Sequence, residues 1–314
     1  MTTVALLSSV DETVEHRVGR EVAFGAAGVE RLLYHYVTDH RKPFIHPLRS
    51  ATGTVLTEME PDDHPWHRGI WFSWKFLNGV NFWEEQEHAG EDAGTGFGHT
   101  EFAGIDEVVW HPAGTRVTTR YAYRVPTGAV VLSEQRTLQV MVQADGVCAL
   151  DWSATFTAGE QPIRFDRTVL AAETPWGGYA GLSFRASRMW GEVQGLDSEG
   201  RRDLAIKHQR ARWVHMSGVD REGRRAGLAI FDHPENPRYP SYWYYADEND
   251  PILHFAYMNP ALLLREPLDL ASGAALQLRY RILVHDGPAD GIALEEQHAA
   301  FAHGEHLAAW KGGR

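Results

Sequence analysis

The fold of this chain is decided by residues 115–142, which read TRVTTRYAYRVPTGAVVLSEQRTLQVMV. Apolar and polar side chains alternate along both halves of this stretch, which is the two-residue period of a β-strand with one buried face. Pro126, Thr127 and Gly128 separate the halves. Because proline presets φ and glycine accepts positive φ, we expect a hairpin turn between them. The stretch therefore predicts two long antiparallel strands.

The same alternation continues on both sides of this hairpin. Residues 99–110 and 147–156 read as its neighbouring strands, joined to it through Pro/Gly-containing turns at 111–114 and 144–146. Long strands at such short spacing favour a sandwich or barrel over βαβ units. Further strands are expected at residues 205–216, 226–231, 241–246, 252–257 and 274–284.

Only the C-terminal part looks helical. Residues 289–310 are rich in Ala, Glu, Gln and Leu, with Asp290 as the expected N-cap. Neither an internal repeat nor a low-complexity linker divides the chain. We therefore predict an all-β protein: one domain over residues 1–314, built as a large antiparallel β-sandwich with a short C-terminal helix. The aperiodic stretch 84–98 is either a binding loop or a surface excursion.

Composition excludes several classes of function. The 314 residues carry 30 Lys and Arg against 42 Asp and Glu, a net charge of −12, which disfavours nucleic acid and anionic membrane surfaces as partners. The single cysteine, Cys148, excludes an internal disulfide and a Cys-based zinc site. No apolar run approaches the ~18–20 residues of a membrane helix, and the first residues do not resemble a signal peptide. We expect a soluble protein of the cytosol.

Residue types that carry chemistry gather in four segments. We expect these segments to line one concave pocket, because His, Arg, carboxylate and Trp side chains are concentrated in them and each lies at the start or end of a strand. They are residues 42–49, 62–84, 173–178 and 231–243.

His64 and His67 are the first candidates for catalysis. Their three-residue spacing on a loop containing Pro65 lets both imidazoles point into one cavity, as acid/base groups or as metal ligands. A metal would need a third ligand. The candidates by residue type are His46, Glu84, Glu173 and Asp232.

A carboxylate is expected as the partner of the imidazoles. Glu173, or else Glu84, could accept or deliver a proton. The alternative for Glu173 is a salt bridge to Arg164 or Arg167. Ligand contacts are expected from polar and aromatic residues of the four segments. These are Lys42, His46, Arg49, Trp74, Asp232, His233, Asn236, Arg238 and Trp243.

The aromatic content points to the ligand. With 11 Trp, 11 Tyr and 13 Phe, aromatic faces beside polar groups suit a sugar, which has C–H faces and hydroxyl edges, although most of these rings are expected in the core. Dinucleotide, P-loop and nucleophile-elbow motifs are absent, so no organic cofactor is expected. A divalent metal remains the open alternative.

Several of these motifs together resemble a known family. The stretches KPFIHPL at 42–48, DHPWHRG at 63–69, NGVNFW at 78–83 and FDHPENPRYP at 231–240, with RYRILVHDG at 279–287, resemble an uncharacterised bacterial family labelled "methane oxygenase PmoA family". This chain has Trp66 where the family often has His, and Glu-Thr-Pro-Trp at 173–176 where it often has Asp-Thr-Lys-Glu. The label conflicts with the lack of a membrane span.

What the resemblance implies is a galactose-mutarotase-like supersandwich, a fold that binds sugars on a concave sheet with His and Glu as proton-transfer groups. The leading hypothesis is a carbohydrate-active isomerase, lyase or hydrolase acting on a mono- or disaccharide or an oxidised (keto) sugar. The alternatives are a noncatalytic sugar-binding protein and a metal-dependent enzyme with His64 and His67 as ligands.

Overall fold

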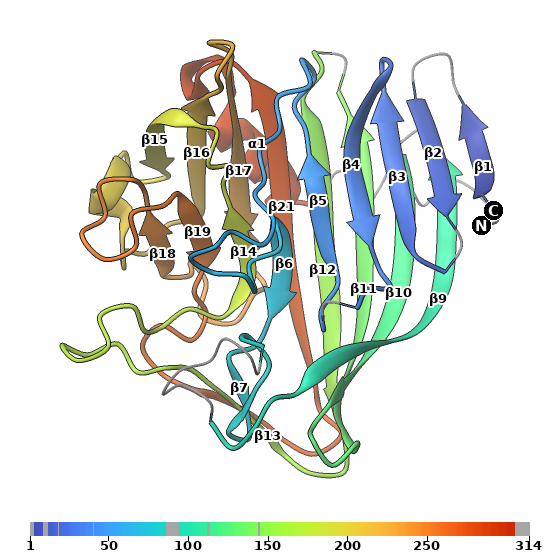
Figure 1. Cartoon of the computed structure of the whole chain (residues 1–314), viewed down its shortest axis with the longest axis vertical. Helices are drawn as coiled ribbons and strands as arrows, with labels where there is room; N and C mark the ends of the chain where they lie inside the picture. The colour runs from blue at the N-terminus through green and yellow to red at the C-terminus, as the bar shows by residue number, and fades with distance from the viewer. Residues whose placement is uncertain are drawn as a thin grey trace.

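Two large antiparallel sheets dominate the structure (Figure 1), a computed structural model that describes residues 3–8, 12–17, 19–39, 41–85, 94–111, 114–143 and 145–304. The first sheet contains nine strands of the described chain. In spatial order they are β1 (Thr3–Ser8), β2 (Glu12–Arg17), β3 (Glu21–Ala26), β4 (Val29–His35), β5 (Phe44–Leu48), β6 (Ile70–Ser73), β14 (Gly181–Arg185), β19 (Tyr257–Pro260) and β18 (Trp243–Ala246).

The second sheet contains eight described strands and lies behind the first in Figure 1. Its order is β15 (Gly191–Asp197), β16 (Trp213–Val219), β17 (Arg225–Asp232), β21 (Ala275–Asp286), β12 (Cys148–Ala158), β11 (Val130–Val142), β10 (Gly114–Arg124) and β9 (His99–His111). A small third sheet closes one end. It has the order β20 (Leu268–Leu270), β13 (Ile163–Asp166), β7 (Phe76–Leu77) and β8 (Val80–Asn81).

The hairpin that the sequence predicts most strongly is confirmed. β10 pairs with β11 in an antiparallel register that sets Thr118 opposite Thr137, and β9 and β12 flank them as expected. Alternate residues of β10, including Tyr121 and Tyr123, are buried, because the two-residue period turns one side of the strand toward the core.

The core lies between the two large sheets. Phe72 of β6 stacks on Trp152 of β12 with ring centroids 4.9 Å apart, and it also stacks on Phe156 at 5.0 Å. Face-to-face packing of two antiparallel sheets through such rings is a β-sandwich, so the predicted fold class is confirmed.

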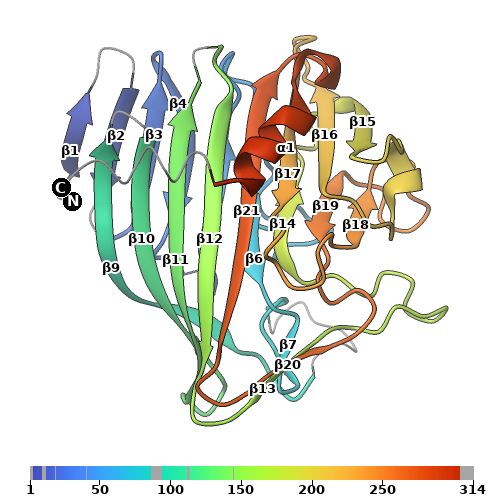
Figure 2. The ribbon, with the colours of Figure 1, turned by 180° about the vertical axis from the view of Figure 1, so that it is seen from behind.

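Helix α1 (Leu294–Ala302) covers the outer face of the eight-stranded sheet (Figure 2), where Phe301 and Leu294 pack against Phe231 and Leu283. The helix is shorter than predicted. Asp290 lies in the 3-10 helix η2 (Ala289–Gly291) and is not the N-cap, which is Ala293. Residues 305–310 of the expected helix lie outside the described residues. Across the described chain, no helix is long and apolar enough to cross a membrane.

Two strand predictions were misplaced for identifiable reasons. Residues 252–256 do not form a strand, because the Asp250 carboxylate accepts the backbone N–H groups of Ile252 and Leu253 at 2.9 and 3.1 Å and holds a turn. Before Trp213, the chain instead forms the 3-10 helix η1 (Asp203–Ile206), and His208 has a positive φ of 61°, which no strand accommodates.

Candidate functional site

A polar and aromatic cluster lies on the outer face of the nine-stranded sheet, the face turned away from the eight-stranded sheet. Strand pleating places it there. On β6, β14, β19 and β18, one set of alternate residues joins the inter-sheet core and the other set faces outward. The outward set includes Trp71, Arg185, Tyr257 and Tyr244.

The loop that carries the two histidines is built from successive tight turns. The backbone N–H of His67 donates to the carbonyl of His64 at 2.9 Å, and that of His64 donates to the carbonyl of Pro61 at 3.0 Å. Gly69 lets this loop press against β5. Its φ is +68°, and a Cβ there would lie 2.5 Å from the carbonyl oxygen of Ile45.

These turns bring the two imidazoles into contact, and their pointing into one cavity stays a prediction. The rings of His64 and His67 stack with centroids 4.7 Å apart. Asp63 contacts His64 Nδ1 at 3.0 Å, and Arg185 Nη2 donates to both oxygens of Asp63 at 3.0 and 2.8 Å. Burial by itself would raise the pKa of the Asp63 carboxyl, but hydrogen bonds from His64 and Arg185 outweigh it and hold that pKa well below its usual value. Asp63 is therefore an anion that orients His64.

His67 differs from its neighbour in environment. Its side chain is 4% exposed, and burial, followed by the positive charges around it, holds its pKa well below 6.5. Arg185 Nη1 lies 3.4 Å from His67 Nδ1, and since a guanidinium can only donate, this nitrogen accepts. His67 is thus a neutral ring with its proton on Nε2.

Aromatic rings surround the histidine pair. Trp66 and Phe255 are half-buried and meet His64 edge-to-face at 5.1 and 4.8 Å. Tyr257 stacks on His67 at 5.6 Å, and the guanidinium of Arg185 lies 3.6 Å from the centroid of Phe255. The pair therefore has aromatic faces on several sides.

A buried ionic group lies beside this cluster. Lys75 Nζ donates to both oxygens of Glu84 at 2.5 and 2.6 Å, and Asn81 Nδ2 and the Tyr179 hydroxyl donate to the same carboxylate at 2.7 and 3.1 Å. With both oxygens bound, Glu84 is placed as a structural anion rather than as a base.

Lys42 also belongs to this region. Its Nζ donates to the Trp83 carbonyl, its side chain is 1% exposed, and its positive charge acts on His67. Burial lowers its pKa to about 7, opposed by the negative charge of Glu85. Lys42 can therefore exchange a proton near neutral pH.

Three buried polar atoms on this face lack a hydrogen-bond partner within the part of the chain that the structure describes. They are Trp71 Nε1, the Tyr244 hydroxyl and His208 Nε2, and the rings of His208 and Tyr244 meet edge-to-face at 5.4 Å. Each of these atoms has less than 1 Å² of accessible surface, so a ligand reaches them only if the surrounding side chains move.

Two predicted contacts from the first segment lie at or beyond the edge of the cluster. His46 faces outward from β5 and contacts Thr57 Oγ1 at 2.9 Å, and burial lowers its pKa to about 4. Arg49 pairs with Glu30 at 2.9 Å near the end of β5 and forms no described contact with the histidines.

The predicted ligand contacts Trp74 and Trp243 are wrong. Both rings are fully buried in the core between the sheets, Trp74 against Phe165 at 4.3 Å and Trp243 with its Nε1 bonded to the Ala211 carbonyl at 2.8 Å. The reason is that side chains alternate between the two faces of the sheet, and each of these rings occupies a position that faces the core.

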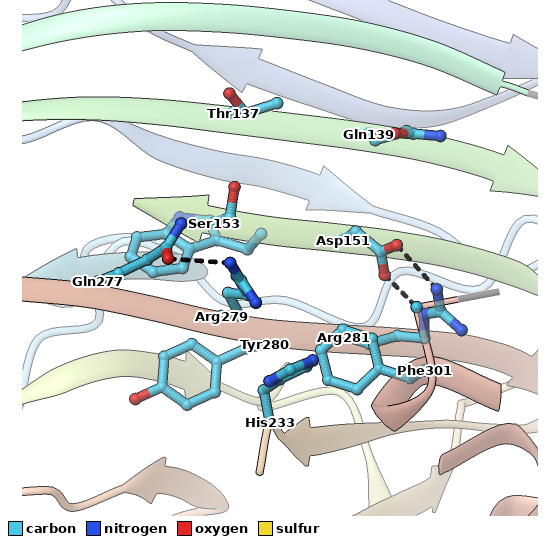
Figure 3. A pocket seen from close by; sticks show the side chains of 12 residues that line it. Thr137, Gln139, Asp151, Ser153, His233, Gln277, Arg279, Tyr280, Arg281 and Phe301 are labelled. Carbon is cyan, nitrogen blue, oxygen red and sulfur yellow. Dashed lines mark hydrogen bonds and ion pairs between the residues drawn. The ribbon is translucent and has the colours of Figure 1, made fainter. Parts of the chain in front are cut away.

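Three residues of the fourth segment, Asp232, His233 and Asn236, do not join the histidine cluster. Asp232 is buried at the end of β17, where Asn236 Nδ2 and the Ser241 N–H each donate to it at 2.7 Å, and burial raises its pKa to about 6. Asn236 also bonds the backbone of Arg279 in the eight-stranded sheet. His233 lines a different cavity of about 190 Å³ on the outer face of that sheet, beside Phe301 (Figure 3). The expectation of one pocket for all four segments is therefore wrong.

Glu173 lies on the exposed loop between β13 and β14 and makes no contact with the histidines among the described residues. It also forms no described salt bridge with Arg164 or Arg167, both of which pair with Asp166. The metal alternative finds no third ligand, since the described residues contain no group of three or more His, Cys, Asp or Glu arranged to hold a metal ion.

Sequence reasoning missed several members of the cluster. Asp63 stands next to His64 and could have been found from that adjacency. Arg185, Tyr244 and Tyr257 come from strands far apart in the sequence, and only the alternation of core and outward positions marks them.

The fold and this cluster define an all-β antiparallel sandwich with a polar, aromatic site on the outer face of one sheet. The chain belongs to the family described as "Family of unknown function (DUF6807)", whose profile matches residues 21–299. This match neither supports nor contradicts the methane oxygenase label. No curated protein sequence matches the chain.

Similar solved structures include a galactose mutarotase related enzyme from Lactobacillus acidophilus, at 10% identity and a TM-score of 0.35, with 90% of this chain and 97% of that chain covered. A GalM/aldose epimerase homologue from C. elegans has 9% identity and a TM-score of 0.35, covering 91% and 98%. A polysaccharide lyase has 13% identity and a TM-score of 0.30, covering 90% of this chain and 34% of its own.

Proposed function

We propose that the protein is a carbohydrate-active enzyme that transfers protons on the outer face of the nine-stranded sheet. The observation that carries the proposal is the Arg185–Asp63–His64 arrangement, in which a clamped carboxylate orients one imidazole. The substrate class is a mono- or disaccharide or an oxidised sugar. Isomerisation, elimination and hydrolysis all begin or end with a proton transfer of this kind.

His64 acts as the proton acceptor in this proposal. Because its Nδ1–H donates to Asp63, the lone pair is on Nε2, and the side chain is 27% exposed and so reachable by a ligand. Neither predicted carboxylate takes this role, since Glu84 is already bound by four donor contacts and Glu173 forms no described contact with the histidines.

His67 stabilises the charge that proton removal creates. A neutral His67 that donates from Nε2 polarises a carbonyl or ring oxygen without giving up its proton. Lys42 is 1% exposed and bonded to the Trp83 carbonyl, so it contributes its charge to the surroundings of His67 rather than a direct contact with the substrate.

The aromatic rings and the polar groups beside them suit a sugar, which has C–H faces and hydroxyl edges. Trp66 and Phe255 are half-buried beside His64 and offer π-faces to sugar C–H groups.

The competing proposal is a noncatalytic sugar-binding protein, which needs the rings but not the oriented imidazole. The test is an NMR screen of sugars and 3-keto sugars with the purified protein, watching for anomeric exchange, elimination or glycosidic cleavage. Conversion that His64→Gln abolishes supports the enzyme. Stoichiometric binding without conversion, equal in wild type and His64→Gln, supports the binder. Activity lost to a chelator and restored by a divalent cation would revive the metal alternative.

A further inference from the structure

A separate cavity of about 230 Å³ adjoins the edge strand β18. Three arginines line it, Arg210, Arg238 and Arg265, together with Tyr242, Leu262 and Glu266. None of these residues takes part in the proton-transfer group described above.

Two of the arginines are held in place by backbone carbonyls. Arg210 Nη1 donates to the carbonyls of Arg238 and Pro240, both at 2.7 Å. Arg238 donates to the carbonyls of Leu262, Glu266 and Pro267 at 2.9, 2.8 and 2.7 Å. A carbonyl fixes the orientation of a guanidinium without neutralising its charge.

Two of the arginines, Arg210 and Arg265, pack over the ring of Tyr242. The guanidinium of Arg210 lies 4.3 Å from the ring centroid and that of Arg265 lies 5.2 Å from it. The hydrogen bond from Arg210 and the charges of both arginines lower the pKa of the Tyr242 hydroxyl. The cavity is therefore strongly electropositive.

Little negative charge balances it. Within the described chain, Arg210 and Arg265 form no salt bridge, and the one carboxylate at Arg238 is the largely exposed Glu266, 3.6 Å away. The protein as a whole carries a net charge of −12, so concentrated positive charge at one cavity is not a general surface property. Planar guanidinium groups match the two oxygens of a carboxylate.

Packed rings connect one wall of the cavity to the proposed site. Tyr242 packs against the outer-face aromatic cluster, and centroids step from His67 to Tyr257 at 5.6 Å, to Tyr244 at 5.9 Å and to His208 at 5.4 Å. Arg265 is close enough to His208 to act on its charge. Because Tyr244 and Tyr257 are buried, this row is packing beneath the surface between the two places and not an open groove.

We propose that this arginine pocket binds the carboxylate of a uronic-acid residue in the carbohydrate substrate. The proposal rests on the proposed function for the identity of the ligand as a sugar. The proposal adds that the substrate is acidic and that its uronic-acid unit lies away from the sugar unit that reacts.

The experiment is a calorimetric titration with glucuronate- and galacturonate-containing disaccharides, their neutral counterparts, and sodium sulfate and phosphate. The variant is Arg210→Gln with Arg265→Gln, both exposed side chains, and Arg265→Gln alone serves if the double variant misfolds. Arg120→Gln, an exposed arginine of β10, is the matched control. We expect the acidic disaccharides to bind at least tenfold more weakly to the variant, and the control to bind like wild type.

Other results overturn the assignment. If sulfate or phosphate binds as tightly as the uronates, the pocket is a site for a free oxyanion. If neutral and acidic sugars bind equally well, the pocket plays no role in recognising a carboxylate. Titrations on His64→Gln separate the two proposals. Arginine-dependent uronate binding without turnover of any sugar by wild type keeps the pocket and removes the enzyme. Turnover of neutral sugars by wild type, without arginine-dependent binding of uronates, keeps the enzyme and removes the pocket.

Discussion

The imidazoles of His64 and His67 stack at a centroid separation of 4.7 Å and an interplanar angle of 29°, yet their surroundings give them different chemistry. His64 is partly exposed and donates to the carboxylate of Asp63, whereas His67 is buried and accepts from Arg185. Two adjacent histidines can thus serve as a base and as a neutral hydrogen-bond donor, because the partner on each Nδ1 sets the tautomer.

Replacing His64 with Gln should lower kcat by about 10²–10⁴-fold on the substrate found by the NMR screen, with a much smaller change in KM. The reason is that a proton acceptor acts in the transition state and adds little to ground-state binding. Steady-state kinetics measures both constants. The control is His254→Asn, which alters an exposed histidine near Phe255 at a positive φ that Asn tolerates. Equal kcat in wild type and His64→Gln would disprove the role.

Asp63→Asn should destabilise the protein at pH 7, and the gap should narrow only as pH falls below about 4. The folded-state pKa of this carboxyl is depressed well below the unfolded value of about 3.9, so its stabilisation is fully present above the unfolded value and is lost as pH falls through the folded one. Urea unfolding of both proteins from pH 7 down to about pH 2 measures the gap. A gap that shrinks already between pH 7 and 5, or that stays constant down to the lowest pH, contradicts the Arg185–Asp63 clamp. Nitrogen-15 NMR of the His64 ring should show a change of tautomer in the variant.

Lys42 should make the protein more stable as pH rises from 7. Because its folded-state pKa is about 7 and its unfolded value about 10.4, the unfolded chain binds more protons in this window and stability increases with pH. The gain between pH 7 and 9 should be about 2 kcal/mol. Lys42→Met should flatten the slope. An unchanged slope in that variant would mean that another group titrates.

Glu84→Gln should cost about 3–5 kcal/mol of stability, because it leaves Lys75 as an uncompensated buried charge. The double variant Lys75→Met with Glu84→Met should recover much of the loss, since neither member of the pair then remains as an unpaired buried charge. Asp106→Asn, which breaks the exposed pair with Arg120, is the comparison and should cost under about 1 kcal/mol. Denaturant unfolding gives all values. Losses of equal size at both pairs would show that the Lys75–Glu84 pair is not buried in solution.

The sequence alone determined the β-sandwich and one part of the site. Alternation with a period of two, together with Pro/Gly turns, predicts β9 to β12 within a residue or two, because these signals are local to each strand. The stacking of His64 and His67 follows from equally local turns at three-residue spacing. Where a side chain competed with the strand backbone, as Asp250 does before Ile252, the local pattern misled.

Only the tertiary structure decided which face each side chain occupies and which distant strands meet. A shift of one residue exchanges core and outward positions, so Trp243 is buried while Tyr244 beside it faces the site. Sheet order sets β14 beside β6 and β19, and this brings Arg185 and Tyr257 to the histidines although neither is near them in the chain. The fourth segment contacts the opposite sheet through Asn236 and Arg279, a long-range pairing that no local pattern encodes.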